Sequence, residues 1–283
     1  MKIDCRKLYA ASLHMMVVAC MFAVLSCAAA TTEAEAVSSG RQHTWWADPG
    51  YWDRRHAAKL KEIASGPKEY DFVFIGDSIT HSWEGWSDPA DLAAVEKAYA
   101  QGMLKFRNGP GRKVWDEMKK EFRLLNLGCA GDTTQNVLWR IENGEMDGYR
   151  THGVALMIGT NNNEPAEQVA DGIKVVVRKI LEKQPNAKVV LMPIFPTGQL
   201  PSAPRRLRNA RASELAKPIA DGERVIWLDF NSVFLDKDGC LSAEMMPDYL
   251  HPLERGYRLW RAAIEPVMRK VISGSIQAKG TRQ

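Results

Sequence analysis

The length, composition and charge of the chain are those of an ordinary globular protein. It has 283 residues, of which 45% are hydrophobic and 25% are charged, so it is long enough for one large domain or two small ones. The formal net charge is only +4, from 38 basic and 34 acidic residues, and like charges do not form long runs. This balance gives no basis for expecting nucleic acid or an anionic membrane as a partner.

The first 30 residues have the pattern of an export signal. Lys2, Arg6 and Lys7 give a positive start, an uninterrupted run of 11 apolar residues follows from Met15 to Leu25, and small residues end the segment. A membrane-spanning helix takes about 20 apolar residues, so this run is too short to span. We therefore expect residues 1–30 to be a signal peptide and the mature protein to be exported, whether to the periplasm, the medium or the bacterial envelope.

Two processing sites fit this leader. Cleavage after Ala30 satisfies the small-x-small pattern, whereas residues 24–27 resemble a weak bacterial lipobox, which makes Cys27 a lipidated N-terminus. A lipid anchor through Cys27 is therefore an open alternative. Residues 31–42 are small and polar, as in a flexible tether, and suit either form of processing.

The mature chain keeps two of the five cysteines. Cys129 and Cys240 remain once Cys5, Cys20 and Cys27 leave with the signal or carry the lipid. Two cysteines do not make a disulfide framework, so we expect two free, buried thiols. No cluster of cysteine and histidine has the spacing of metal ligands, and we expect no structural zinc.

Five short apolar runs are spaced along the chain at the length of strands. Their apolar character is continuous rather than alternating, which indicates strands buried on both faces of a sheet. Helical patterns lie between them, and this alternation predicts a parallel sheet with helices on both faces. The predicted strands are Phe72–Ile75, Leu124–Leu127, Val154–Ile158, Val189–Met192 and Val225–Leu228. The predicted helices are Asp53–Ser65, Ala90–Ala100, Thr133–Glu142, Glu164–Lys183, Arg205–Ala216 and Leu253–Ile272.

These elements predict one domain over residues 43–275, followed by a disordered tail at 276–283. No internal repeat divides the chain. Residues 84–121 are longer than one crossover connection needs, and they contain a helical piece and a Gly-Pro-Gly turn. We interpret them as an insertion beside the edge of the sheet that carries the active site.

Polar residues follow the carboxyl ends of the predicted strands, where ligands bind in open α/β sheets. The first strand ends in Gly76-Asp77-Ser78, and a serine at a strand-to-helix turn projects its hydroxyl into the crevice. A serine nucleophile needs a base to remove its proton and donors to hold the developing oxyanion. Gly131, before a predicted helix, and Asn161, after the third strand, are candidate donors through a backbone and a side-chain amide.

The candidate base lies just before the last predicted helix. Asp248 stands three residues before His251, where it is able to turn back and hold the Nδ1–H of the ring, which leaves Nε2 free to deprotonate Ser78. Each motif is weak alone, because Gly-Asp-Ser is common in loops and Asp-x-x-His pairs usually cap helices or form surface ion pairs. Together they predict a catalytic triad, because every motif falls directly after a strand or before the last helix.

The four blocks resemble those of the SGNH (GDSL-type) hydrolases. Gly76-Asp77-Ser78, Gly131, Gly159-Thr160-Asn161 and Asp248-x-x-His251 occur in the family's order. Residues 131–140 and 248–251 are most similar to the catalytic subunits of platelet-activating-factor acetylhydrolase Ib and their bacterial relatives. The likeness runs over roughly residues 68–272 and implies the family's flavodoxin-like fold. That fold is a three-layer α/β/α sandwich around a five-stranded parallel sheet with strand order 2-1-3-4-5.

The resemblance also implies the role of each site residue. Ser78 is expected to be the nucleophile and His251 the base, with Asp248 orienting it. The expected oxyanion hole consists of the Ser78 and Gly131 amides and the Asn161 side chain, and neither a metal nor an organic cofactor is expected. As supporting residues, Asp77 and Asp132 are expected to hold backbone amides in their turns.

Other residues near the motifs have structural interpretations. We expect His56 at the surface and a local ion pair between Arg140 and Glu142. Trp83 and Trp86 fit pocket walls or core packing equally well. An aromatic cluster before the first helix is expected to cap a core, with sugar binding as the alternative; its members are Trp45, Trp46, Tyr51 and Trp52.

The function favoured by these features is hydrolysis of a short acyl ester through an acyl-enzyme. The export signal favours acetyl esters on extracellular carbohydrate. A lipid acetylhydrolase or a broad short-chain esterase is the alternative. The export signal and the insertion after Ser78 weaken the case for assigning the lipid-mediator substrate of the similar enzymes to this chain. A catalytically silent glycan-binding protein has no need of Ser78, Asp248 and His251 together. The oligomeric state is left open by the sequence.

Overall fold

The computed structural model describes residues 40–41 and 49–280. The predicted signal with Cys27 lies outside these residues, as do Trp45 and Trp46. No helix in the described part of the chain is long and apolar enough to cross a membrane.

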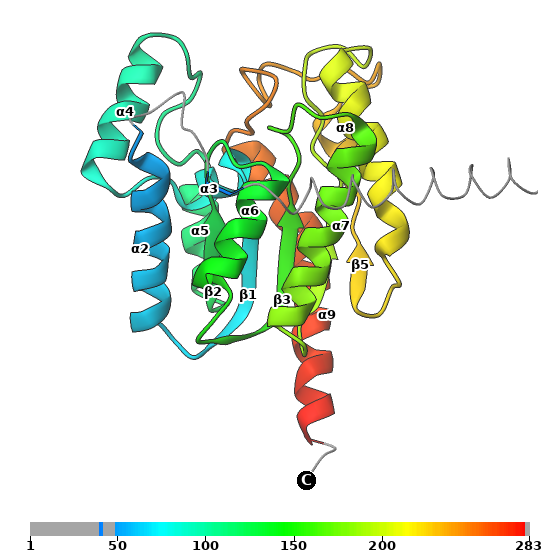
Figure 1. The fold of residues 1–283 in the computed structure, drawn as a ribbon. Helices are drawn as coiled ribbons and strands as arrows, with labels where there is room; N and C mark the ends of the chain where they lie inside the picture. The colour runs from blue at the N-terminus through cyan, green and yellow to red at the C-terminus, as the bar shows by residue number, and fades with distance from the viewer. Residues whose placement is uncertain (1–39, 42–48, 281–283) are drawn as a thin grey trace, which may run out of the picture.

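The five predicted strands form a single parallel sheet in the order β2-β1-β3-β4-β5, which confirms the expected fold (Figure 1). Each strand overlaps its predicted range, and the ends differ by a few residues. The strands are β1 (Glu69–Gly76), β2 (Leu124–Gly128), β3 (Arg150–Met157), β4 (Lys188–Leu191) and β5 (Val225–Trp227).

Both faces of the sheet are buried because successive side chains of a strand point to opposite faces. In β1, Val73 and Ile75 pack into the core on one face, and Phe72 and Phe74 into the core on the other. All four side chains are at most 1% exposed. This double burial explains why the strands read as continuous apolar runs.

Helices cover the two faces and one edge of the sheet (Figure 1). One core contains residues of α6, α7 and α8, the other contains residues of α3, α5 and α9, and α2 and α4 lie beyond the β2 edge. The helices are α2 (Tyr51–Ser65), α3 (Ser78–Glu84), α4 (Pro89–Ala100), α5 (Arg112–Lys119), α6 (Thr134–Arg140), α7 (Ala166–Lys183), α8 (Pro204–Ala216) and α9 (Glu254–Gly280). Short helical turns are η1 (Ile141–Glu145), η2 (Lys217–Ile219) and η3 (Asn231–Phe234).

Three segments differ from the sequence prediction. Helix α5, which precedes β2 in the chain, was not predicted. It packs into the core on one face of the sheet, so the part of the predicted insertion that lies outside the main layers is residues 85–111. Helix α6 ends at Arg140 and is followed by η1, where Gly144 has a φ of 106° that breaks the helical path. Helix α9 continues to Gly280, so much of the segment predicted as a disordered tail is helical.

A third, smaller core joins α2, the insertion and the loop after β2. It contains Tyr51 and Trp52, which are at most 1% exposed, together with Trp86, Phe106 and Cys129. The described half of the aromatic cluster therefore packs into a core. Cys129 is buried and Cys240 half-buried, and both are free thiols.

Candidate active site

Ser78, His251 and Asp248 form one hydrogen-bonded chain although 173 residues separate the serine from the histidine. Ser78 Oγ lies 2.8 Å from His251 Nε2, and His251 Nδ1 lies 2.7 Å from Asp248 Oδ2. The ring therefore has a carboxylate on one nitrogen and a hydroxyl on the other. This arrangement allows Nε2 to take the Ser78 proton while Asp248 holds the ring in the required tautomer.

The turn that carries the base is held by its own backbone. Asp248 Oδ1 accepts hydrogen bonds from the amides of Leu250 at 3.0 Å and His251 at 2.8 Å. Tyr249 has a φ of 55°, which non-glycine residues adopt rarely. Its carbonyl accepts from the Gly198 amide at 2.8 Å, a contact that fixes the left-handed turn. The side chain of Asp248 thus both shapes the turn and faces the ring.

Asp248 is ionised in this setting. Burial by itself would raise the pKa of the carboxyl, but the hydrogen bonds and charge of His251 and the amide of Leu250 outweigh it and lower the pKa below its ordinary value. An ionised Asp248 is an acceptor, so His251 Nδ1 carries the proton and donates it to Oδ2. His251 Nε2 is then the acceptor for the Ser78 hydroxyl.

Close packing places Ser78 at the end of β1. A Cβ on Gly76 would lie 2.2 Å from Thr80 Oγ1 and 2.5 Å from the Met157 carbonyl oxygen, so only glycine fits before the turn. Asp77 then caps α3, because its Oδ1 accepts from the Ile79 amide at 3.0 Å. Burial raises the pKa of Asp77 to about 6, against the opposing effects of that amide and of His251. Ser78 is therefore the first residue of α3, at the carboxyl edge of the sheet.

The three predicted oxyanion donors lie around the same pocket as the triad. Ser78, Gly131 and Asn161 all line it. Gly131 has a φ of 86°, the left-handed conformation that glycine adopts without strain. Asn161 Nδ2 donates to the Asp132 carbonyl at 3.0 Å, which ties the donor after β3 to the turn that carries Gly131.

The pocket has a volume of about 330 Å³. One wall comes from the insertion and is apolar: Trp86, Ala98, Met103, Leu104 and Phe106. Phe106 packs against the His251 ring at a centroid distance of 4.9 Å. Of the predicted insertion at 84–121, residues between 86 and 106 border the pocket. Trp86 is a pocket wall, whereas Trp83 is fully buried in the core.

The chain matches known proteins over the segment that builds this site. The model of the GDSL-like Lipase/Acylhydrolase family matches residues 74–259. Platelet-activating factor acetylhydrolase IB subunit alpha1 of Bos taurus is 39% identical over 213 residues, 74% of this chain and 78% of the relative. The chain belongs to the GDSL-like lipase/acylhydrolase family. It is therefore a hydrolase that acts on esters.

Two solved structures share the fold of this GDSL-like chain. A GDSL-like lipase from Bacteroides thetaiotaomicron aligns with a TM-score of 0.54 at 15% identity, over 76% of this chain and 97% of the other. The acetyl xylan esterase AlAXEase aligns with a TM-score of 0.51 at 18% identity, over 69% and 98% of the two chains. At this level of identity the likeness concerns the fold.

A buried ion network supports the turn that carries Gly131 in this GDSL-like chain, and sequence reasoning missed it. Asp132 accepts from Trp52 Nε1 and from Arg140 Nε, both at 2.8 Å. Arg140 also pairs with Glu145, rather than with Glu142 as predicted. Burial raises the pKa of Asp132 to about 6, although the charge of Arg140 opposes the shift.

His56 completes this network instead of lying at the surface. Its Nδ1 is 2.8 Å from Glu145 Oε1, and its side chain is only 12% exposed. The ring also stacks with Trp52 at a centroid distance of 6.0 Å. Burial would raise the pKa of Glu145, but Arg140 and His56 together lower it, so Glu145 is ionised.

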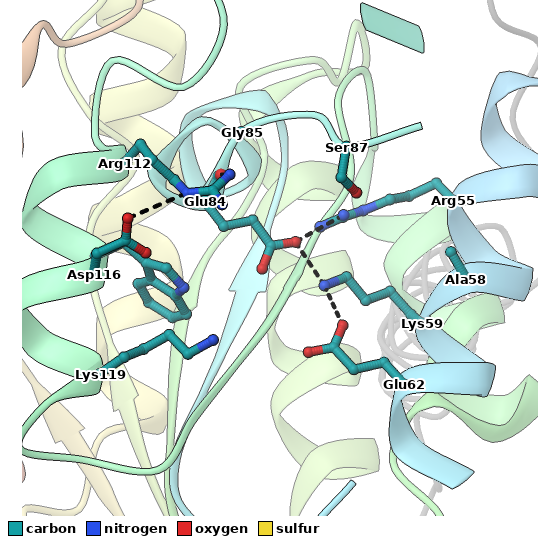
Figure 2. Close-up of a pocket in the computed structure, with 11 residues that line it drawn as sticks. Arg55, Ala58, Lys59, Glu62, Glu84, Gly85, Ser87, Arg112, Asp116 and Lys119 are labelled. Carbon is teal, nitrogen blue, oxygen red and sulfur yellow. Dashed lines mark hydrogen bonds and ion pairs between the residues drawn. The ribbon is translucent and has the colours of Figure 1, made fainter. Parts of the chain in front are cut away.

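A second pocket, of about 250 Å³, lies between α2, α3 and α5. Figure 2 shows its charged side chains pointing toward one another. Glu84 pairs with Arg55 at 2.8 Å and with Lys59 at 2.6 Å, and Lys59 also contacts Glu62 at 2.8 Å. These charges are neutralised internally, and Arg55 in addition donates to the Gly128 carbonyl at 2.9 Å. The cluster therefore fixes α2 and α3 to the end of β2.

No group of three or more His, Cys, Asp or Glu side chains within the described ranges is arranged to hold a metal ion.

The pocket that contains Ser78 is also lined by Arg205, which sequence reasoning placed only at the start of a helix. The proline that precedes Arg205 is favoured in the first turn of helices, so the sequence indicates where α8 begins but not that Arg205 lines the pocket.

Proposed function

We propose that the chain is a serine esterase in which Ser78 is the nucleophile. Ser78 Oγ attacks the ester carbonyl while His251 Nε2 takes its proton, and Asp248 stabilises the imidazolium that forms. The oxyanion is held by the Ser78 and Gly131 amides and the Asn161 side chain. His251 then protonates the leaving alcohol, and a water that it activates releases the acid from the acyl-enzyme. The Ser78–His251–Asp248 hydrogen-bonded chain is the observation that carries this proposal.

We propose a short acyl group, most simply acetyl, on an extracellular carbohydrate as the substrate. The acetyl group is supported by relatives at 39% identity that are named acetylhydrolases. The carbohydrate rests on the export signal expected in residues 1–30. For the same reason we propose that the mature protein is exported, with lipidation at Cys27 as the alternative to cleavage after Ala30. Mass spectrometry of the mature N-terminus distinguishes the two.

A lipid acetylhydrolase is the second candidate. It is favoured by the name of the same relatives and by the apolar pocket wall of Met103, Leu104 and Phe106. A broad short-chain esterase would use this wall in the same way. The acyl pocket and the leaving group are therefore tested separately.

A comparison of nitrophenyl acetate with nitrophenyl octanoate tests the acyl group. We expect kcat/KM for acetyl to exceed that for octanoyl by at least about 10-fold, because a site that fits a small acyl group excludes a long one. Equal or higher rates on octanoyl would contradict the short-acyl proposal. For the leaving group, release of acetate from acetylated xylan and from an acetylated phospholipid analogue is measured side by side. Activity confined to the phospholipid would overturn the carbohydrate proposal.

A further inference from the structure

Arg205 lines the pocket that contains Ser78. It is the second residue of α8, and its side chain lines the pocket together with Asn161 and His251. The residue as a whole is exposed, so its charge is accessible from solvent. A substrate that occupies the pocket therefore lies near this guanidinium.

The guanidinium is fixed in place by the backbone beside the oxyanion site. Arg205 Nε and Nη2 donate to the Thr160 carbonyl at 3.1 and 2.6 Å. Thr160 directly precedes Asn161, so the cation is anchored one residue from a proposed oxyanion donor. Holding the planar group in advance reduces the entropy that is lost when it binds a ligand.

The charge of Arg205 acts on the buried Asp77 carboxyl but is not neutralised by a direct ion pair. Within residues 40–41 and 49–280, no carboxylate forms an ion pair with it, whereas Arg140 and Arg55 are both paired. Asp248 is the carboxylate among the pocket-lining residues, and its oxygens already accept from His251 and Leu250. The pocket thus carries a fixed positive charge on one side.

The surroundings of Arg205 strengthen this preference for a negative group. Helix α8 has 13 residues, no acidic residue in its first turn and no side-chain cap at its N-terminus. The partial positive charge of the helix start therefore adds to that of Arg205. The insertion supplies an apolar wall to the same pocket, through Met103, Leu104 and Phe106. The side with Arg205 suits a negative part of an ester, and the wall from the insertion suits an apolar part of the same ester.

We infer that Arg205 binds an anionic group on the alcohol portion of the ester, either a carboxylate or a phosphodiester. This inference rests on the proposed function, in which Ser78 cleaves the ester. The fork of an arginine matches both kinds of oxyanion. Arg205 is then a specificity-determining residue, and its contact with Thr160 sets its position.

Two matched pairs of acetyl esters test this role. Acetylated glucuronic acid is compared with acetylated glucose, and an acetylated glycerol phosphodiester with acetylated glycerol. We expect Arg205→Gln to raise KM for the anionic member of a pair by about 10-fold, the effect of losing a charged hydrogen bond at an exposed site, and to leave the neutral member unchanged. Arg205→Lys keeps the charge, so its KM for the anionic esters should lie between those of the unaltered enzyme and Arg205→Gln. The pair with the larger change identifies the source of the anion as sugar carboxylate or phosphodiester.

Arg208→Gln is the control, because it removes the same charge one turn along α8, where Arg208 donates to the Asn209 side chain instead of lining the pocket. It should leave both pairs unchanged. If Arg205→Gln lowers kcat equally for charged and neutral esters, the residue only holds the Thr160 loop and the inference is overturned. Equal KM values of the unaltered enzyme within both pairs would also overturn it. If none of the four esters nor nitrophenyl acetate is cleaved, the proposed function itself fails.

Discussion

Replacing His251 by glutamine is expected to lower kcat for ester hydrolysis by roughly 10⁴- to 10⁶-fold. Ser78 Oγ lies 2.8 Å from His251 Nε2, which takes its proton, and glutamine has no basic group that replaces this nitrogen. The residual rate would come from substrate binding and the oxyanion donors. The measurement is steady-state hydrolysis of nitrophenyl acetate, with circular dichroism to show that the variant is folded.

His152→Gln is the matched control for this prediction. His152 is also a buried histidine next to a carboxylate, Glu69, at 3.5 Å, but it lies near the start of β3, at the opposite end of the strands from Ser78. Its replacement should leave kcat unchanged. Asp248→Asn should lower kcat less than loss of the base does, by about 10²- to 10⁴-fold, because it only removes the orienting carboxylate. An Asp248→Asn enzyme with an unchanged rate would contradict the role of that residue.

Replacing Arg140 by methionine is expected to lower the free energy of unfolding by about 3–5 kcal/mol. Arg140 is 2% exposed and neutralises both Asp132 and Glu145, each at most 1% exposed. Methionine has a similar length, so the change removes the charge while leaving little empty space. The two carboxylates would then be buried without their partner. Urea unfolding at pH 7 measures the effect.

Arg112→Met serves as the control for Arg140. Arg112 also pairs with a carboxylate, Asp116, but both side chains are more than half exposed, and an exposed pair contributes about 0–1 kcal/mol. A loss of less than 1 kcal/mol in Arg140→Met would show that the network around Asp132 does not stabilise the fold. Asp132 also accepts from Asn161 through its carbonyl, so a folded Arg140→Met enzyme should lose kcat as well.

The central sheet could be predicted from sequence because each strand is buried on both faces and reads as a continuous apolar run. Helix α5 was missed although its buried residues Val114, Trp115 and Met118 have helical spacing, because the helix is short and follows a Gly-Pro-Gly turn that reads as a loop. The extra length of α9 was missed because its last residues are polar. Continuous apolar runs thus predict the strands, whereas short or largely polar helical segments are missed even where they pack into the core.

The candidate site was predictable to the extent that it depends on local motifs. Asp248 and His251 are three residues apart, and the turn that joins them is held by bonds within that segment. The Trp52–Asp132 contact joins residues 80 positions apart, and the Arg140–Glu145 pair depends on the turn made by Gly144. The first contact follows from the packing of distant segments, and the second from a local break in the helix, so an apolar pattern indicates neither.

Covalent labelling by a fluorophosphonate tests the central claim, that Ser78 is the nucleophile of this site, most directly. We expect one label per chain, on the peptide that contains Ser78, and no labelling of Ser78→Ala. Ser202→Ala, which removes an exposed serine near the start of α8, should be labelled like the unaltered protein. Labelling that persists in folded Ser78→Ala would contradict the assignment of the nucleophile.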